Sequence, residues 1–457
     1  MKIAIIGGGF TGLSAAYELT KKGHRVTLFE KEKTLGGLAH GFTRPGWDWH
    51  LESAYHHLFT NDKAILGLIK ELGLADKLIV KRPITANYIP PSVIARSLRR
   101  SNLVLDEIAT PSERSRDDNG TIVQLDSPLH LLAYPGLSLA DKLRTGALLA
   151  SIKLNPFWQP FEWITAKKLF LTIGGARAWE TIWEPLMIGK FGKYSDSVAA
   201  SWLWARIKKR TPKLCYIKGG FHTLISALEQ AIIHRGGTIK KNCKYDCDRI
   251  FKYNSFSHTP FDRILLTIPT PTTIPHLHAQ VLILETKEPI LQGLQEDLLQ
   301  RCKRSSYEKK SIYWLNICDR TFPFLAVVAH TNMIDKKYYG GHHLTYFGNY
   351  LPSGHPYLSM TKEQLLKTFL PYIKRLNPSF LKSYVISHTS FLGLYAQPVH
   401  ELHYSRRAPK LETPIKGLYL ANMDSIYPWD RGTNYAVELG KCAADIICHP
   451  REREDPE

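Results

Sequence analysis

The chain has 457 residues, with 60 Lys and Arg against 41 Asp and Glu, which gives a formal charge of +19 with neutral histidines. A hydrophobic share of 44% and an aromatic share of 11% exclude a disordered or low-complexity protein, because such chains lack the residues for a core. No apolar run approaches the roughly 20 residues that a membrane-spanning helix needs. At roughly 150 residues per domain, the length predicts about three domains.

The N-terminal residues and the cysteines favour a cytoplasm-like compartment. MKIAIIGGG leads directly into a predicted strand, without a charged n-region or a cleavage site. The 7 cysteines include no CxxC pair, so a disulfide framework is not indicated. We therefore expect a cytoplasmic protein with reduced thiols.

The first 30 residues predict a βαβ unit. The apolar run 2–6 ends at a glycine cluster, as a buried parallel strand does. A helical pattern follows and ends at Gly23, and residues 25–30 supply a second strand.

The rest of the chain alternates between helical and extended patterns. Paired prolines, an arginine cluster and a polar tract in 90–120 predict an exposed, mobile insertion. Helical periodicity with many aromatics follows from 131 to 210, and the α/β alternation returns from 216 to 268. Further strands are expected at 311–317, 324–330, 343–349 and 417–422, with helices at 362–376 and 434–447.

A nucleotide-binding fingerprint lies between the first strand and the first helix. In Gly7-x-Gly9-x-x-Gly12, the first glycine makes the tight turn, the second lets the backbone approach a pyrophosphate, and the third allows close helix–strand packing. The helix N-terminus attracts phosphate, and Glu30 can accept hydrogen bonds from a ribose diol. A glycine-rich turn in an unrelated α/β protein is the alternative, and the fingerprint alone does not choose between NAD and FAD.

The continuation of this segment resembles one family. An acid followed closely by Gly36-Gly37 is similar to the opening of the flavin-containing family of amine oxidases, protoporphyrinogen oxidase and phytoene-type desaturases. The resemblance implies FAD as the cofactor. It places these residues along the bound FAD: Gly7, Gly9, Phe10, Thr11, Gly12, Glu30, Lys31, Gly36, Gly37, Leu38 and Ala39.

Later segments resemble the same family. Residues 216–239 are similar to its second FAD segment, which places Tyr245 and Pro269 near the cofactor. Residues 417–440 resemble its C-terminal strand and helix, although Asn422-Met423-Asp424 replaces the usual Gly-Asp or Gly-Glu. The resemblance assigns Asn422, Met423, Asp424, Thr433, Asn434 and Tyr435 to the flavin, and residues from Glu184-Pro185 are similar to the protoporphyrinogen oxidase branch.

We therefore predict an α/β fold in which a Rossmann-like FAD-binding domain, opened by the βαβ unit with GxGxxG, is interleaved with a mixed-sheet plus helical substrate domain. The FAD-binding domain is expected to comprise residues 1–85, 214–275 and 400–449. A helical substrate subdomain is expected at 86–213, a β-rich substrate domain at 276–399 and a tail at 450–457.

Three residues are candidates for chemistry. His56 and His57 follow the Gly-Gly loop, in a region that passes close to the flavin ring in the family, and histidine changes charge near neutral pH. Arg431 precedes the flavin-facing helix, and its guanidinium suits a carboxylate or phosphate. Structural roles in a polar corner of the core, or in a turn with Asp430, are equally open.

No metal site is predicted, because the histidines show no ligand spacing with carboxylates or thiols. Tyr395 and Gln397 are expected either to line the substrate cavity or to belong to a core strand.

The basic residues concentrate between 206 and 252, where 12 Lys and Arg face three acids. The stretch 202–210 joins tryptophans to a basic end, which is typical of an interfacial helix. A solvated basic face, attraction to anionic lipid at the inner membrane face, and nucleic-acid binding are the open interpretations. No nucleic-acid module accompanies the charge, so we expect no nucleic-acid partner.

The leading hypothesis is an FAD-dependent oxidoreductase of the amine oxidase and protoporphyrinogen oxidase type. A hydride would pass from a hydrophobic or planar organic substrate to flavin N5, with the protein supplying orientation and water exclusion. One alternative is an enzyme resembling UDP-galactopyranose mutase, without net redox, which residues 55–62 suggest. A second alternative is a degenerate flavin-binding scaffold.

Overall fold

The computed structural model describes residues 1–90, 120–125, 127–134, 136–247, 259–291 and 311–449. Nearly all of the predicted insertion at 90–120, and the predicted tail at 450–457, lie outside these residues. The chain forms two compact units. Unit 1 comprises Met1–Val80, Leu214–Ile274 and Tyr404–Glu457, and unit 2 comprises Lys81–Lys213 and Pro275–His403. Each unit is therefore built from segments that are distant in the sequence.

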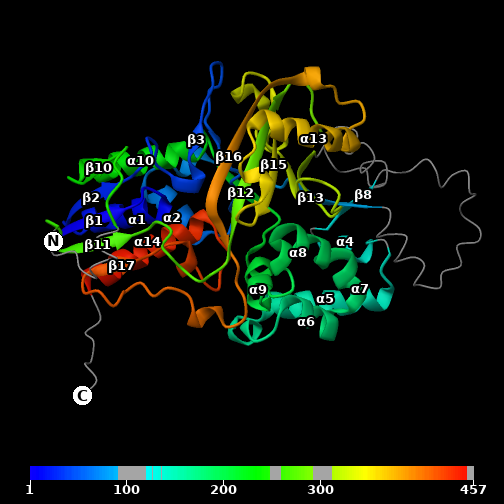
Figure 1. Cartoon of the computed structure of the whole chain (residues 1–457), viewed down its shortest axis with the longest axis horizontal. Coiled ribbons are helices and arrows are strands. Elements are labelled where there is room, and N and C mark those ends of the chain that lie inside the picture. Colours follow the sequence, from blue (N-terminus) through cyan, green and yellow to red (C-terminus); the bar gives the residue numbers. More distant parts are fainter. Residues whose placement is uncertain (91–119, 126, 135, 248–258, 292–310, 450–457) are drawn as a thin grey trace, which may run out of the picture. The chain divides into compact units, whose positions relative to one another are not determined.

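Unit 1 is organised around a five-stranded parallel sheet with the order β10-β2-β1-β11-β17. Strands β1 and β11 at its centre carry apolar runs that are almost wholly buried, as expected for a parallel sheet that is covered on both faces. The strands are β1 (Lys2–Ile6), β2 (Arg25–Phe29), β10 (Thr238–Lys240), β11 (Arg263–Leu266) and β17 (Leu418–Leu420), all visible in Figure 1.

Helices α1 (Phe10–Lys21), α10 (Phe221–His234) and α14 (Thr433–Cys448) accompany this sheet, and α1 packs against both of the others. Gly440 allows α14 to approach α1 closely, since a Cβ there would collide with the Thr11 carbonyl oxygen. The smaller elements are α2 (Lys63–Glu71), β3 (Gly41–Phe42), β4 (Leu51–Glu52), β5 (Leu58–Phe59), β6 (Leu78–Lys81) and β9 (Leu214–Ile217).

Unit 2 contains a seven-stranded mixed sheet with the order β16-β12-β15-β14-β13-β7-β8. Only β7 and β13 pair in parallel among the strands whose register the described residues define. The strands are β7 (Ile84–Ile89), β8 (Thr121–Gln124), β12 (His276–Thr286), β13 (Ile312–Ile317), β14 (Ala326–Ala329), β15 (His343–Leu351) and β16 (Val385–Pro398). Helix α13 (Lys362–Leu376) packs on this sheet through Phe369, which joins a cluster with Leu282 and Phe347. The α/β fold with a parallel and a mixed sheet is confirmed.

No strand was expected at β12, and within β16 a core strand was one of two expectations for Tyr395 and Gln397. Strands β12 and β16 are the longest strands described. Strand β16 lies at the sheet edge and is exposed over much of its length, so it lacks the polar–apolar alternation of a half-buried strand. Its pairing with β12 is a non-local contact that no local pattern encodes.

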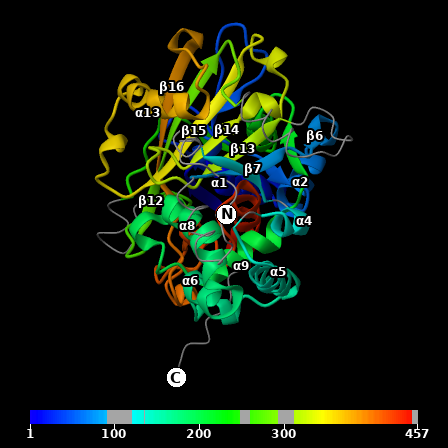
Figure 2. The same ribbon diagram turned by 90° about the vertical axis from the view of Figure 1, so that its right-hand side faces the viewer.

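The remaining helices of unit 2 gather together, as Figure 2 shows for α5, α6, α8 and α9. Helix α8 contacts β13 and β15. These remaining helices of unit 2 are α4 (Pro128–Leu132), α5 (Leu139–Leu154), α6 (Ala166–Leu169), α7 (Ala176–Ala178), α8 (Glu184–Phe191) and α9 (Ala200–Lys209), with one-turn π-helices η4 (Phe170–Gly174) and η5 (Trp179–Trp183).

Helix α9 does not present its tryptophans outward, so its interpretation as an interfacial helix is wrong. Trp202 and Trp204 are 3% and 2% exposed. The Trp204 indole donates a hydrogen bond to the Asn155 carbonyl, 3.0 Å away, and the Lys190 ammonium lies 4.6 Å from the centre of the Trp202 ring. Both rings therefore belong to the core. Within the described ranges, no helix is long and apolar enough to cross a membrane.

Replacing Gly440 by alanine should lower the free energy of unfolding by about 1–3 kcal/mol, because the added methyl group forces α14 away from α1. Gly67→Ala on α2 is the matched control. A Cβ at residue 67 meets nothing within 4 Å, so this change should stabilise by roughly 0.5–1 kcal/mol. Urea unfolding of both variants measures the difference, and equal stabilities would contradict the tight contact between α1 and α14.

Candidate flavin site

The glycine loop between β1 and α1 has two structural glycines and one that faces open space. Gly7 has φ +112°, which favours glycine, and a Cβ on Gly12 would collide with the Gly7 carbonyl. A Cβ on Gly9 would instead have as its nearest neighbour the Gly37 Cα at 3.9 Å. The chain itself therefore does not require glycine at position 9, and the open space there fits a ligand that the backbone must approach closely.

The N-terminus of α1 offers hydrogen-bond donors to such a ligand. Gly9 is the N-cap residue, and no side chain caps the helix. The first-turn N–H groups, which include those of Phe10, Thr11 and Gly12, have no partner within a helix. These donors and the helix dipole favour a phosphate at this position.

Glu30 fixes the glycine loop from the end of β2. Its side chain is 8% exposed, and its oxygens accept hydrogen bonds from Gly8 N at 2.6 Å and Glu32 N at 2.9 Å. Each carboxylate oxygen has a second lone pair, which can accept from a ribose hydroxyl. The neighbouring Lys31 is exposed and pairs with Glu32 at 3.5 Å.

The Gly36-Gly37 loop lies directly on the first glycine loop. Gly36 N donates to Gly8 O at 2.8 Å, and Gly36 forms a parallel bridge with Gly9. Gly36 and Gly37 both have positive φ, and a Cβ on Gly37 would come within 3.2 Å of the Gly9 Cα. Two of the predicted segments therefore meet here, and Leu38 and Ala39 follow in a short turn, with Ala39 buried.

A second uncapped helix N-terminus is that of α14. Gly432 is its N-cap residue, and no side chain caps it. The Asn434 side-chain oxygen accepts from Ala64 N at 3.0 Å and Ile65 N at 3.2 Å, so this side chain holds the start of α2. Thr433 begins the helix, and the Tyr435 ring stacks on Trp429 with centres 5.4 Å apart. The backbone N–H of Asn434 belongs to the first turn of α14 and has no partner within the helix.

The unusual Asn422-Met423-Asp424 segment forms an internally bonded turn. Asn422 Oδ1 accepts from Asp424 N at 3.0 Å, and Asn422 Nδ2 donates to Ile268 O at 3.3 Å. The buried Asp424 accepts a hydrogen bond at its carbonyl from the Tyr404 hydroxyl, 3.0 Å away. The segment is therefore fixed to β17 and to the residues that follow β11.

The second predicted FAD segment lies at the same sheet. The Tyr245 ring packs on Phe29, at the end of β2, with centres 5.0 Å apart, and burial raises the pKa of the tyrosine. Pro269 follows β11 and is exposed.

His56 is held neutral. Its Nδ1 donates to the Ala54 carbonyl at 2.7 Å, which assigns the proton to Nδ1 and leaves Nε2 as an acceptor. Burial lowers its pKa to about 4, and the nearby charge of Arg431 acts in the same direction. Asp430 accepts from Arg431 N at 3.0 Å, and the His57 ring meets Phe59 edge-on. The structure thus brings His56 and Arg431 into electrostatic contact.

Two polar residues near the Gly-Gly loop were not predicted. Glu52, 1% exposed, accepts from the Tyr216 hydroxyl at 2.8 Å and from Phe221 N at 2.7 Å, and burial raises its pKa to about 7. The His40 ring bonds the Gly37 carbonyl at 2.8 Å and the Ser53 hydroxyl at 2.9 Å. Neither residue belongs to a spaced motif, and the partners of Glu52 come from distant positions in the sequence.

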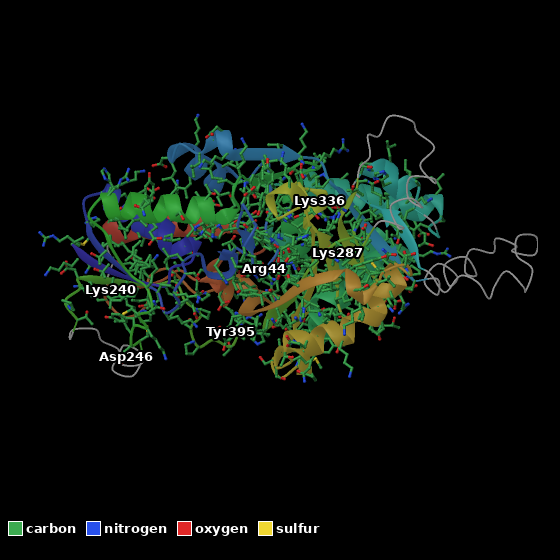
Figure 3. All side chains as sticks on the ribbon, turned by 90° about the horizontal axis from the view of Figure 1, so that it is seen from above. Arg44, Lys240, Asp246, Lys287, Lys336 and Tyr395 are labelled. Atoms are coloured by element: carbon green, nitrogen blue, oxygen red, sulfur yellow. The ribbon has the colours of Figure 1, made fainter. Side chains whose placement is uncertain are left out.

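The two candidates on β16 have different surroundings. Tyr395, labelled in Figure 3, is 44% exposed, has φ +53°, and lies 5.4 Å from the rings of both His276 and His278. Gln397 is fully buried and donates to the Pro398 carbonyl at 2.9 Å. No group of three or more His, Cys, Asp or Glu that could hold a metal occurs among the described residues.

Glu52→Gln should flatten the pH dependence of stability. The folded-state pKa of about 7 lies above the ordinary 4.5, so the carboxyl contributes stability at low pH that is lost as the pH rises from 4.5 to 7. The neutral amide avoids this loss, which is on the order of 2–3 kcal/mol. Unfolding free energies at pH 5 and pH 8, with the exposed Glu32→Gln as control, measure the effect. Equal slopes for wild type and Glu52→Gln would contradict the shifted pKa.

Helix α1, the Gly36-Gly37 loop and helix α10 lie in a part of the chain that matches a known protein family. The family model "Flavin containing amine oxidoreductase" matches residues 10–247, just over half of the chain. Zeta-carotene desaturase of Arabidopsis thaliana is 25% identical over 277 residues, which cover 55% of this chain and 44% of the relative. The chain thus matches less than half the length of that relative.

Two solved structures share the fold. An oxidoreductase from Methanosarcina mazei superimposes with a TM-score of 0.64 at 17% identity, covering 97% of this chain and all of that chain. Reduced UDP-galactopyranose mutase gives a TM-score of 0.65 at 14% identity, covering 98% of this chain and 95% of that chain. The fold and the family model agree: the chain belongs to the flavin-containing amine oxidoreductase family, and its cofactor is FAD.

Proposed function

We propose that the protein is an FAD-dependent oxidoreductase that removes a hydride and a proton from an apolar organic substrate, with extended polyenes as the first candidates. The observation that carries the proposal is the opening at Gly9, where two glycine loops and an uncapped helix N-terminus meet. The match to a zeta-carotene desaturase supports the substrate class. We further propose a cytoplasmic location.

Residues of unit 1 would hold the cofactor. The N–H groups at the start of α1 suit the pyrophosphate, and Glu30 suits a ribose diol. The N-terminus of α14 offers further donors for the flavin end. The other proposed contacts are Lys31, Gly36, Gly37, Leu38, Ala39, Tyr245, Pro269, Asn422, Met423, Asp424, Thr433, Asn434 and Tyr435.

Bound FAD supplies the acceptor for the hydride. The chain orients the substrate and excludes water. It also supplies a path for the proton that the substrate loses as its new double bond forms. His56 Nε2 is the proposed relay atom, because Nδ1 is committed to Ala54. A pKa of about 4 makes it a weak base that passes the proton onward at neutral pH. We propose His57 as a second polar group and Arg431 as a cation that positions a polar end of the substrate.

A mutase without net redox is the second candidate, because residues 55–62 resemble UDP-galactopyranose mutase and the fold matches one. Such a likeness at 14% identity shows the fold alone. Reaction type therefore has to be tested directly.

Purified protein should be yellow, and anaerobic addition of a polyene substrate should bleach the flavin absorbance, because hydride transfer reduces the flavin. His56→Asn, which retains a side-chain N–H for the Ala54 carbonyl, should bleach more slowly and change the pH profile of the rate. Stopped-flow absorbance measures both.

Tetrapyrroles and amines serve as comparison substrates. Activity that is seen only after dithionite reduction, with a UDP-sugar, would establish the mutase instead. A colourless protein that takes up no FAD would contradict both enzymes and leave the scaffold.

Gly9→Val should abolish FAD binding while leaving the apoprotein folded. The valine side chain points toward the opening and blocks the approach of a pyrophosphate, and the chain has room for its Cβ. Flavin content and the thermal midpoint of the apoprotein measure the two effects, with Gly67→Val as the control for adding the same side chain elsewhere. Stoichiometric FAD in Gly9→Val would refute this placement of the cofactor.

A further inference from the structure

Helix α5 of unit 2 carries an apolar stripe on its outer face. The stripe recurs every three or four residues, so its members share one side of the helix. They are Leu139, Leu143, Ala147, Ala150 and Leu154, all exposed, with the three leucines at 67%, 59% and 79%.

The opposite face of α5 is the buried one. Thr145, Leu148 and Ile152 are buried there, and the helix packs against α9 and η4. An ordinary surface helix places charged and polar residues opposite its buried face. Helix α5 instead has apolar residues on both faces, so its outer leucines lack a partner in the folded unit that the structure describes.

A neighbouring helix adjoins the stripe. Helix α4 contacts α5 and adds two exposed apolar side chains, Leu129 and Leu132. The Lys142 ammonium bonds the Leu132 carbonyl at 2.7 Å, which holds α4 beside α5. We call the whole set the leucine surface: Leu129, Leu132, Leu139, Leu143 and Leu154.

Exposed apolar side chains are clustered on the leucine surface and not scattered singly, as they are on most protein surfaces. Among the described residues, 17 large hydrophobic side chains are exposed, and five of them lie on the neighbouring helices α4 and α5. Scattered apolar residues are normal on a surface, whereas contiguous ones mark a protein or membrane contact.

The charges beside the leucine surface are mainly positive. Arg144 and Lys153 are exposed on α5, and Asp141 is the one acid between residues 127 and 154. The C-terminus of α9 lies beside that of α5, because Lys153 Nζ bonds the Arg210 carbonyl at 3.0 Å and Lys208 Nζ bonds the Lys153 carbonyl at 2.9 Å. The basic end of α9 therefore adjoins Leu154.

We propose that the leucine surface docks the protein on an anionic lipid bilayer. Apolar side chains would enter the interfacial region, and the lysines and arginines around them would lie at the level of the headgroups. The positive charge favours anionic lipid over a second copy of the same basic surface, because like charges would face each other in such a dimer. The proposal is independent of the proposed reaction.

This assignment changes the role of α9. The helix contributes its basic C-terminus to the docking surface, while Trp202 and Trp204 remain in the core.

Co-sedimentation of the FAD-loaded protein with phosphatidylcholine vesicles, with and without phosphatidylglycerol, tests the proposal. Wild type should bind the anionic vesicles, and raised salt should weaken the binding because screening removes its electrostatic part. The triple variant Leu139→Gln/Leu143→Gln/Leu154→Gln should bind at least roughly tenfold more weakly, because it removes three apolar side chains from the contact. Glutamine is a good helix former, so α5 should remain folded.

Two further variants keep the outcome interpretable. Ile233→Gln on α10 replaces another exposed apolar side chain, 47% exposed, and should leave binding unchanged. Arg144→Gln, the charge variant, should weaken binding to anionic vesicles while keeping the apolar residues. FAD content and thermal midpoint confirm folding of each variant.

Three results would contradict docking of the leucine surface on lipid. Wild type that fails to bind anionic vesicles, or binding that neither the triple nor the charge variant changes, would refute the proposal. Sedimentation that shows a dimer dissociated by the triple variant would assign the leucine surface to a second copy of the chain instead.

Discussion

The contact between the first glycine loop and Glu30 is the constraint on which the flavin site depends. Gly8 N bonds the buried carboxylate at 2.6 Å, and Gly12 packs where any side chain would collide with the Gly7 carbonyl. Together they fix the turn that leads from β1 into α1. The uncapped start of α1 is therefore held in one orientation. Its N–H groups and the helix dipole favour a phosphate there without a charged side chain.

The rest of unit 1 is built onto this turn. The Gly36-Gly37 loop bonds to it directly, and Gly440 brings α14 against Thr11 on the following helix. Asn434 then fixes the start of α2 through Ala64 and Ile65. Glu52 performs a similar task for α10, where a shifted pKa is the consequence of burying a carboxyl at a helix start. Polar side chains thus hold the starts of α2 and α10, whereas the starts of α1 and α14 carry no side-chain cap.

The leucine surface and the basic charge find a common explanation in unit 2. Charge by itself suggested several partners, and only the exposed leucines of α5 favour a lipid surface among them. Bonds between the ends of α5 and α9 bring the basic residues to that surface. Burial of Trp202 shows that a tryptophan beside lysines in a sequence does not by itself make an interfacial helix.

The sequence determined the parts of the fold whose signals are local. Strand β1, helix α1 and helix α13 follow from apolar periodicity, and Gly7, Gly9, Gly12 and Glu30 from their spacing. Tertiary structure decided what depends on distant partners. Strand β16 forms because β12 pairs with it, and Glu52 became visible only through Tyr216 and Phe221, which the fold brings to it. It also decided which apolar residues face inward, because helical periodicity gives the faces of α5 and α9 but not which face is covered. Local interactions are encoded within a few residues, whereas burial and pairing depend on the whole chain.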